Sequence, residues 1–71
     1  MHFALDVHKN DLETARDLMK SRARVNWIVS DSHPSDGRFQ RFVFETREDR
    51  DKVRRVLRQQ RISCFIAPFY S

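Results

Sequence analysis

The chain is poor in the residues with which many small proteins stabilise themselves covalently or through metals. Its 71 residues include one cysteine, one glycine and two prolines. A single cysteine excludes an internal disulfide and a cage of thiolate ligands around zinc. Cys64 is flanked by apolar residues in the stretch ISCFIA, and this environment predicts a buried thiol that is inert rather than nucleophilic.

Long hydrophobic runs are also missing. No apolar stretch approaches the ~20 residues of a membrane-spanning helix, and the N-terminal stretch MHFALDVHKN is too short and too polar for a signal peptide. A lone thiol suits a reducing compartment. We therefore expect a soluble, cytoplasmic protein that folds as one domain over residues 1–71, near the lower size limit for a chain without disulfides or metals.

So small a core leaves little stability for a deep pocket or a strained active site. We therefore expect no cofactor and no bound metal. The composition favours a small binding or regulatory protein over an enzyme.

Hydrophobic periodicity divides the chain into six elements. Alternation of apolar and polar residues predicts strands, and apolar residues three or four apart predict helices. Asn10 and Glu13 predict a capping box for the first helix, and Thr46 predicts the N-cap of the second. The expected strands are residues 2–7, 25–30, 39–45 and 62–70, and the expected helices are residues 10–23 and 46–60.

The order of these elements is β-α-β-β-α-β. Each helix joins two strands that follow one another in the sequence, which requires a crossover, and crossovers are right-handed. This order predicts a ferredoxin-like α+β sandwich, in which a four-stranded antiparallel sheet of order 4-1-3-2 has both helices on one face. The alternative is an arrangement in which the last strand pairs with another subunit.

The net charge of the chain is concentrated in the second helix. Residues 47–61 carry seven basic and three acidic side chains, a difference of +4, which equals the net charge of the whole chain with its 14 basic and 10 acidic residues. Arginine predominates, and its planar guanidinium suits phosphate and carboxylate groups. This pattern favours an acidic macromolecule as partner, RNA or single-stranded DNA ahead of an acidic protein surface. The predicted contact residues are Lys52, Arg54, Arg55, Arg58 and Arg61.

The same run of charge has a simpler interpretation. An exposed helix needs a polar outer surface, and arginine is a good helix former. On this interpretation Val53, Val56, Leu57 and Gln60 face the core, and the arginines opposite them are only solvated.

Strand alternation places apolar residues on the sheet face that the helices leave uncovered. If Phe42 and Phe44 face the helices, their neighbours point the other way. A contiguous apolar patch on such a face usually marks an interface, either with a second copy or with a partner protein that is regulated or inhibited. Arg41 in this patch would need an acceptor across the interface, since an unpaired buried charge is costly. The predicted interface residues are Ile28, Phe39, Arg41, Val43 and Phe65.

Part of the chain resembles the RNA recognition motif. The stretch RFQRFVFETREDRDKV, residues 38–53, is similar to the third strand and second helix of that family. The resemblance implies that RNA bases stack on the open sheet face, where Phe39 and Phe65 would supply the aromatic rings. Gln40 and Arg41 stand where the family has its glycine-rich aromatic signature.

A third hypothesis is a small metal-dependent nuclease. An aspartate at the end of the first strand, Asp6, is similar to that of the Cas2-like and VapD-like nucleases, which use this fold as dimers. We expect the first and third strands to be parallel neighbours, which would place Asp6 and His8 beside Glu45. Carboxylates and a histidine grouped in this way could bind a divalent metal or transfer protons.

Overall fold

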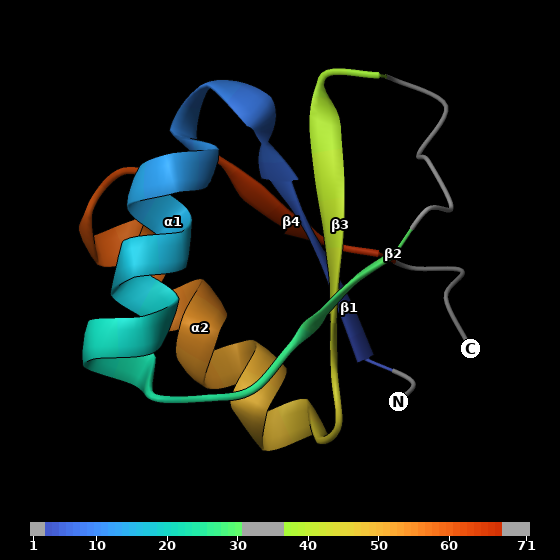
Figure 1. Cartoon of the computed structure of the whole chain (residues 1–71), viewed down its shortest axis with the longest axis vertical. Coiled ribbons are helices and arrows are strands. Elements are labelled where there is room, and N and C mark those ends of the chain that lie inside the picture. Colours follow the sequence, from blue (N-terminus) through green and yellow to red (C-terminus); the bar gives the residue numbers. More distant parts are fainter. Residues whose placement is uncertain (1–2, 31–36, 68–71) are drawn as a thin grey trace.

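A four-stranded antiparallel sheet packs against two helical segments in a computed structural model of the chain (Figure 1). The structure describes residues 3–30 and 37–67. Both helical segments lie on the same side of the sheet, which leaves the other face without a helical cover (Figure 1). The elements are β1 (Phe3–His8), α1 (Leu12–Leu18), β2 (Ile28–Ser30), β3 (Phe39–Phe44), α2 (Arg47–Gln59) and β4 (Cys64–Ile66).

The strands are arranged in the order β2-β3-β1-β4, which reads 4-1-3-2 from the opposite edge. Every pair of neighbouring strands is antiparallel. In the central pair, Phe3 of β1 lies opposite Phe44 of β3, and His8 lies opposite Phe39. The prediction of a small α+β fold with a four-stranded antiparallel sheet and two helices is confirmed.

The core lies between the sheet and the helices. Alternate residues of β1 and β3 point to the helical side, as the period of two in their sequences requires. Trp27 contacts the core from one side, with its ring 6.3 Å from that of Phe42 in an edge-on arrangement. The core cluster consists of Leu5, Val7, Ala15, Met19, Ala23, Phe42, Phe44, Val53, Leu57 and Ile62.

Helix α2 begins at a side-chain cap. The Thr46 hydroxyl accepts a hydrogen bond of 3.1 Å from the backbone N–H of Asp49, which confirms Thr46 as the N-cap. Glu48 and Asp49 occupy the first turn, where negative charge interacts favourably with the helix dipole. The sequence therefore specifies where this helix starts.

Helix α2 ends in a Schellman motif. The N–H of Ile62 donates to the carbonyl of Leu57 at 3.0 Å, and the N–H of Arg61 donates to the carbonyl of Arg58 at 3.0 Å. This pair of bonds closes the last turn. It requires a left-handed residue at Arg61, whose φ is 59°, and that conformation favours glycine over residues with a side chain.

The first helical segment is less regular than expected. A 3-10 turn over Lys9–Asp11 precedes α1, and a π-helical turn over Met19–Ala23 follows it. Because the 3-10 turn starts early, His8 takes the capping position, and its Nδ1 accepts a 3.2 Å hydrogen bond from the N–H of Asn10. The predicted capping box of Asn10 and Glu13 is therefore wrong.

The two edge strands are shorter than expected. β2 covers three residues because the chain before it leaves the sheet, and Val25 and Trp27 pack against the core from there. Val29, expected in the core, is exposed. Gln60, expected on the inner face of α2, is exposed because it lies beyond the last helical turn. The expected strand residues 2 and 68–70, and most of the expected connection 31–38, lie outside the described residues.

No helix formed by residues 3–30 and 37–67 combines the length and the apolar character needed to cross a membrane.

Candidate functional site

Five basic side chains on the second half of α2 and just beyond it form what we term the α2 basic surface. Four of them are exposed, and Arg54 is half-buried. None of the five forms an ion pair with any residue that the structure describes. The α2 basic surface consists of Lys52, Arg54, Arg55, Arg58 and Arg61.

The first turns of α2 treat their arginines differently. Arg50 donates from Nε and Nη2 to Oδ1 of Asp51, at 3.0 and 2.9 Å. The guanidinium groups of Arg50 and Arg47 also lie over the ring of Phe3, at 5.6 and 5.9 Å from its centre, where the ring face attracts a cation. Unneutralised positive charge on α2 therefore begins only after Asp51.

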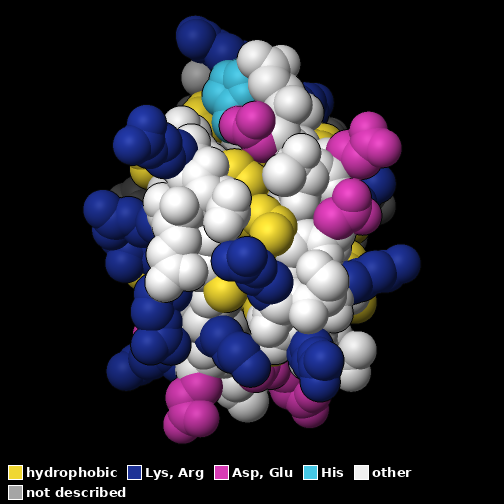
Figure 2. All heavy atoms as spheres, turned by 90° about the vertical axis from the view of Figure 1, so that its left-hand side faces the viewer, with side chains coloured by type: hydrophobic (Ala, Val, Ile, Leu, Met, Phe, Trp, Pro, Cys, Tyr) yellow, Lys and Arg dark blue, Asp and Glu magenta, His cyan; other side chains and the backbone are white. Residues whose placement is uncertain are grey.

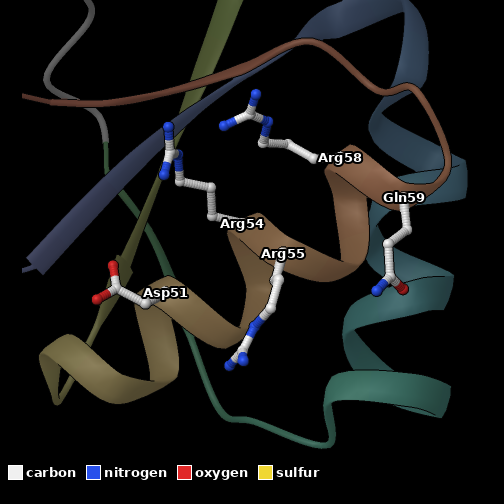
Figure 3. Close-up of a pocket in the computed structure, with 5 residues that line it drawn as sticks. All are labelled: Asp51, Arg54, Arg55, Arg58 and Gln59. Carbon is white, nitrogen blue, oxygen red and sulfur yellow. The ribbon is translucent and has the colours of Figure 1, made fainter.

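A shallow depression of about 550 Å³ runs along the outer side of α2 and is lined by Asp51, Arg54, Arg55, Arg58 and Gln59 (Figure 3). Arg54 and Arg58, one helical turn apart, extend to the same side of the helix, and Arg55 extends to the other side (Figure 3). Arg54 follows the buried Val53 by one residue, which is about 100° of rotation around the helix. It therefore lies on the flank of α2 rather than opposite the core, which differs from the expectation for this residue.

Arg54 has a donor that no protein group satisfies. Its Nε is shielded from solvent and has no hydrogen-bond acceptor. A buried donor left without an acceptor costs about 1–3 kcal/mol. Such a donor is a position at which an external anion would restore a lost hydrogen bond.

Cys64 of β4 lies close enough to this flank to be affected by its charges. Burial raises the pKa of the Cys64 thiol, and the nearby cations Arg54 and Arg58 act in the opposite direction. The net effect keeps the thiol protonated at neutral pH, as expected for an unreactive cysteine. Cys64 is half-buried, however, and not fully buried as predicted.

Figure 2 views the molecule from the helical side. Lys and Arg side chains gather along one margin and over the lower half of this face, with Asp and Glu between and around them (Figure 2). A polyanion that approached the helical layer would therefore meet a surface of mainly positive charge.

The opposite layer contains an ion pair that the sequence interpretation missed. Arg41 of β3 donates from Nε to Oδ1 of Asp6 at 2.8 Å and from Nη2 to Oδ2 at 3.0 Å. Asp6 is only 7% exposed, and the register places it directly opposite Arg41. The expectation that Arg41 needs an acceptor from a partner is wrong, because its own chain supplies one.

The apolar patch expected on this face is smaller than predicted. Val43 was expected to face water, but it is buried, because Ala4 and Ala67 pack around it. Ile28 and Phe65 remain 51% and 55% exposed. The strand faces are thus as predicted, but the centre of the patch is covered.

One end of the sheet face holds three aromatic rings. The ring of Phe39 lies 5.1 Å from that of Phe65 and 5.2 Å from that of His8, both in edge-on contact. His8 also caps the first helical segment through Nδ1. A single histidine therefore joins the helix start to the aromatic cluster, a role that the sequence alone gave no reason to expect.

The structure removes the geometric basis of the nuclease hypothesis. β1 and β3 are antiparallel, not parallel, because the hairpin between β2 and β3 reverses the chain. Glu45 follows Phe44, which pairs with Phe3 at the opposite end of β1 from His8. Asp6 is engaged by Arg41. In the described ranges, no group of three or more His, Cys, Asp or Glu side chains is arranged to hold a metal ion.

Comparisons with models of protein families, with curated proteins and with solved structures found no match to this chain. Its function has to be inferred from the geometry described above.

Proposed function

We propose that the protein is a small binding protein that holds RNA or single-stranded DNA through the α2 basic surface. The observation that carries this proposal is the set of five basic side chains without an ion pair in the described part of the chain. Positive charges that no carboxylate neutralises repel one another and are stabilised when a polyanion displaces their counterions.

The chemistry of the surface supports phosphate as the group it contacts. Four of the five side chains are arginines, whose guanidinium donors match phosphate oxygens. Contacts to phosphate carry no sequence information by themselves. The expected binding is therefore salt-sensitive and largely independent of base sequence.

The fold provides the frame for this surface. We further infer that the two layers form a ferredoxin-like sandwich, an inference supported by the β-α-β-β-α-β element order and by the strand order β2-β3-β1-β4. In this frame α2 presents its basic side chains away from the sheet face.

The test measures affinity for a short fluorescent RNA and for single-stranded DNA between about 50 and 200 mM salt, where counterion release dominates. The triple variant Arg54→Gln, Arg55→Gln, Arg58→Gln should lower the slope of log affinity against log salt by about 2, at about 0.7 per lost contact on a single strand. The matched control Arg16→Gln, Lys20→Gln, Arg22→Gln removes the same charge from the first helical segment.

The two variants separate a local site from general attraction. A control variant that loses as much slope as the α2 variant would show that binding follows net charge alone. A wild-type protein that binds neither RNA nor single-stranded DNA at 50–100 mM salt would end the nucleic-acid proposal.

A second candidate function is supported by the exposure of Phe65 beside Ile28 on the sheet face. On this proposal the face docks onto a second copy of the chain. Phe65→Ser serves as a further arm of the same experiment, because it leaves α2 intact. If Phe65→Ser abolishes binding or converts a dimer to a monomer in size-exclusion chromatography with light scattering, the sheet face is the working surface.

A further inference from the structure

The arginines of the α2 basic surface are not equivalent. Arg54 and Arg58 are four residues apart, so their side chains are neighbours on one flank of the helix. Figure 3 shows both extending to that side, with Arg55 directed away. The flank also borders β4, since the charges of Arg54 and Arg58 both act on Cys64.

Arg50 occupies the same flank one turn earlier and has a different role. Its guanidinium is taken by Asp51 and by the ring of Phe3. Asp51 lines the depression together with Arg54 and Arg58, but its Oδ1 already accepts both hydrogen bonds from Arg50. The one carboxylate in the depression therefore neutralises Arg50 and leaves the two later arginines to an external ligand.

We infer that Arg54 and Arg58 together hold a single phosphate group on the flank of α2 that borders β4. The solvent-shielded Nε of Arg54, which has no acceptor, would donate to one phosphate oxygen, and the guanidinium of Arg58 would donate to another. This inference rests on the proposed function, because it specifies how the nucleic-acid backbone would be held there. Arg55, on the other side of the helix, would contact a different phosphate or none.

Cys64 provides a reporter at this site. The thiolate is the form that reacts with alkylating reagents, and the cations Arg54 and Arg58 favour it by lowering the pKa of the thiol against the effect of burial. A phosphate bound between them would neutralise that effect. Occupation of the site should therefore slow alkylation of Cys64.

The first experiment follows alkylation of Cys64 by iodoacetamide, a neutral reagent, at pH 8 with and without inorganic phosphate. Ionic strength is held constant with sodium chloride. Phosphate should slow the wild-type reaction by about threefold to tenfold, since the reactive thiolate becomes rarer. The variant Arg54→Gln, Arg58→Gln should react slowly from the start and show no phosphate effect, and the matched control Arg55→Gln should respond as the wild type does.

A second readout does not depend on access to Cys64. A ligand that binds only the folded state raises the thermal midpoint. Phosphate should raise the midpoint of the wild type and of Arg55→Gln, and it should leave Arg54→Gln, Arg58→Gln unchanged. Phosphate that alters neither alkylation nor the midpoint of the wild type overturns the inference.

The second experiment replaces phosphate by the RNA used for the affinity measurements. One shared phosphate predicts that Arg54→Gln, Arg58→Gln lowers the salt slope by about 0.7, whereas two separate contacts predict about 1.4. Protection of Cys64 by phosphate without RNA binding would refute the proposed function and retain the site. RNA binding with a slope loss of about 1.4, or without protection of Cys64, would retain the function and refute the shared site.

Discussion

The two layers of the molecule use partly buried arginines in opposite ways. On the sheet, Arg41 lies opposite Asp6 and donates two hydrogen bonds to it. On helix α2, Arg54 is also half-buried, but its Nε has no acceptor, and it forms no ion pair with the described residues. The comparison teaches that an arginine stabilises this fold where the strand register supplies a carboxylate, and is available to an external anion where it does not.

The largest expected effect comes from breaking the sheet pair. Asp6→Asn should lower the free energy of unfolding by about 2–4 kcal/mol, because the guanidinium of Arg41 would lose its carboxylate in a largely buried position. Urea unfolding followed by circular dichroism measures the change. The exposed Asp17→Asn on α1 is the control and should stay within about 0.5 kcal/mol of the wild type. A cost below about 1 kcal/mol for Asp6→Asn would show that the sheet pair adds little to stability.

A second pair of variants tests the contrast directly. Arg54→Met keeps the apolar stem and removes the unsatisfied donor, so the free energy of unfolding should stay the same or rise by up to about 1 kcal/mol. Arg41→Met removes a satisfied donor and strands the Asp6 carboxylate, so it should fall by about 2–3 kcal/mol. Changes of the same sign in urea unfolding would break the comparison. Affinity for RNA should fall for Arg54→Met even though stability does not.

The smallest expected effect is at Arg61. This member of the α2 basic surface has a left-handed backbone, with φ of 59°, in which glycine is favoured over a residue with a side chain. Arg61→Gly should therefore raise the free energy of unfolding by about 0.5–1 kcal/mol. Arg61→Ala is the control, because it removes the charge and keeps the strain. An Arg61→Ala variant as stable as Arg61→Gly would show that charge repulsion, not backbone strain, sets the cost at this position.

Local signals in the sequence were sufficient for much of the fold. The alternation around Phe42 and Phe44 placed both rings in the core, where the structure has them. Thr46, followed by acidic residues, marked the start of α2. These predictions succeeded because each depends on residues only a few positions apart, whose geometry is set by the helix or strand period.

The features that could not be predicted depend on pairing between distant segments. The ion pair of Asp6 and Arg41 requires the register of β1 on β3, which no local pattern specifies. The burial of Val43 depends on Ala4 and Ala67 in the neighbouring strands. The loss of an acceptor at Arg54 depends on where α2 meets the sheet. The α2 basic surface could be located from charge alone, but the difference between its members could not.

The pairing of Asp6 with Arg41 also acts on the states that the chain must avoid while folding. A shift of β1 against β3 by one residue would place Asp6 opposite Gln40 or Phe42 and turn Leu5 and Val7 out of the core, so hydrophobicity already opposes it.

A shift by two residues keeps every side chain on its proper face, and burial of apolar surface barely penalises it. That shift would set Asp6 opposite Phe39 or Val43 and would separate the two charges. The ion pair therefore discriminates against the misaligned sheets that apolar packing tolerates, and it supplies the fold with alignment as well as stability.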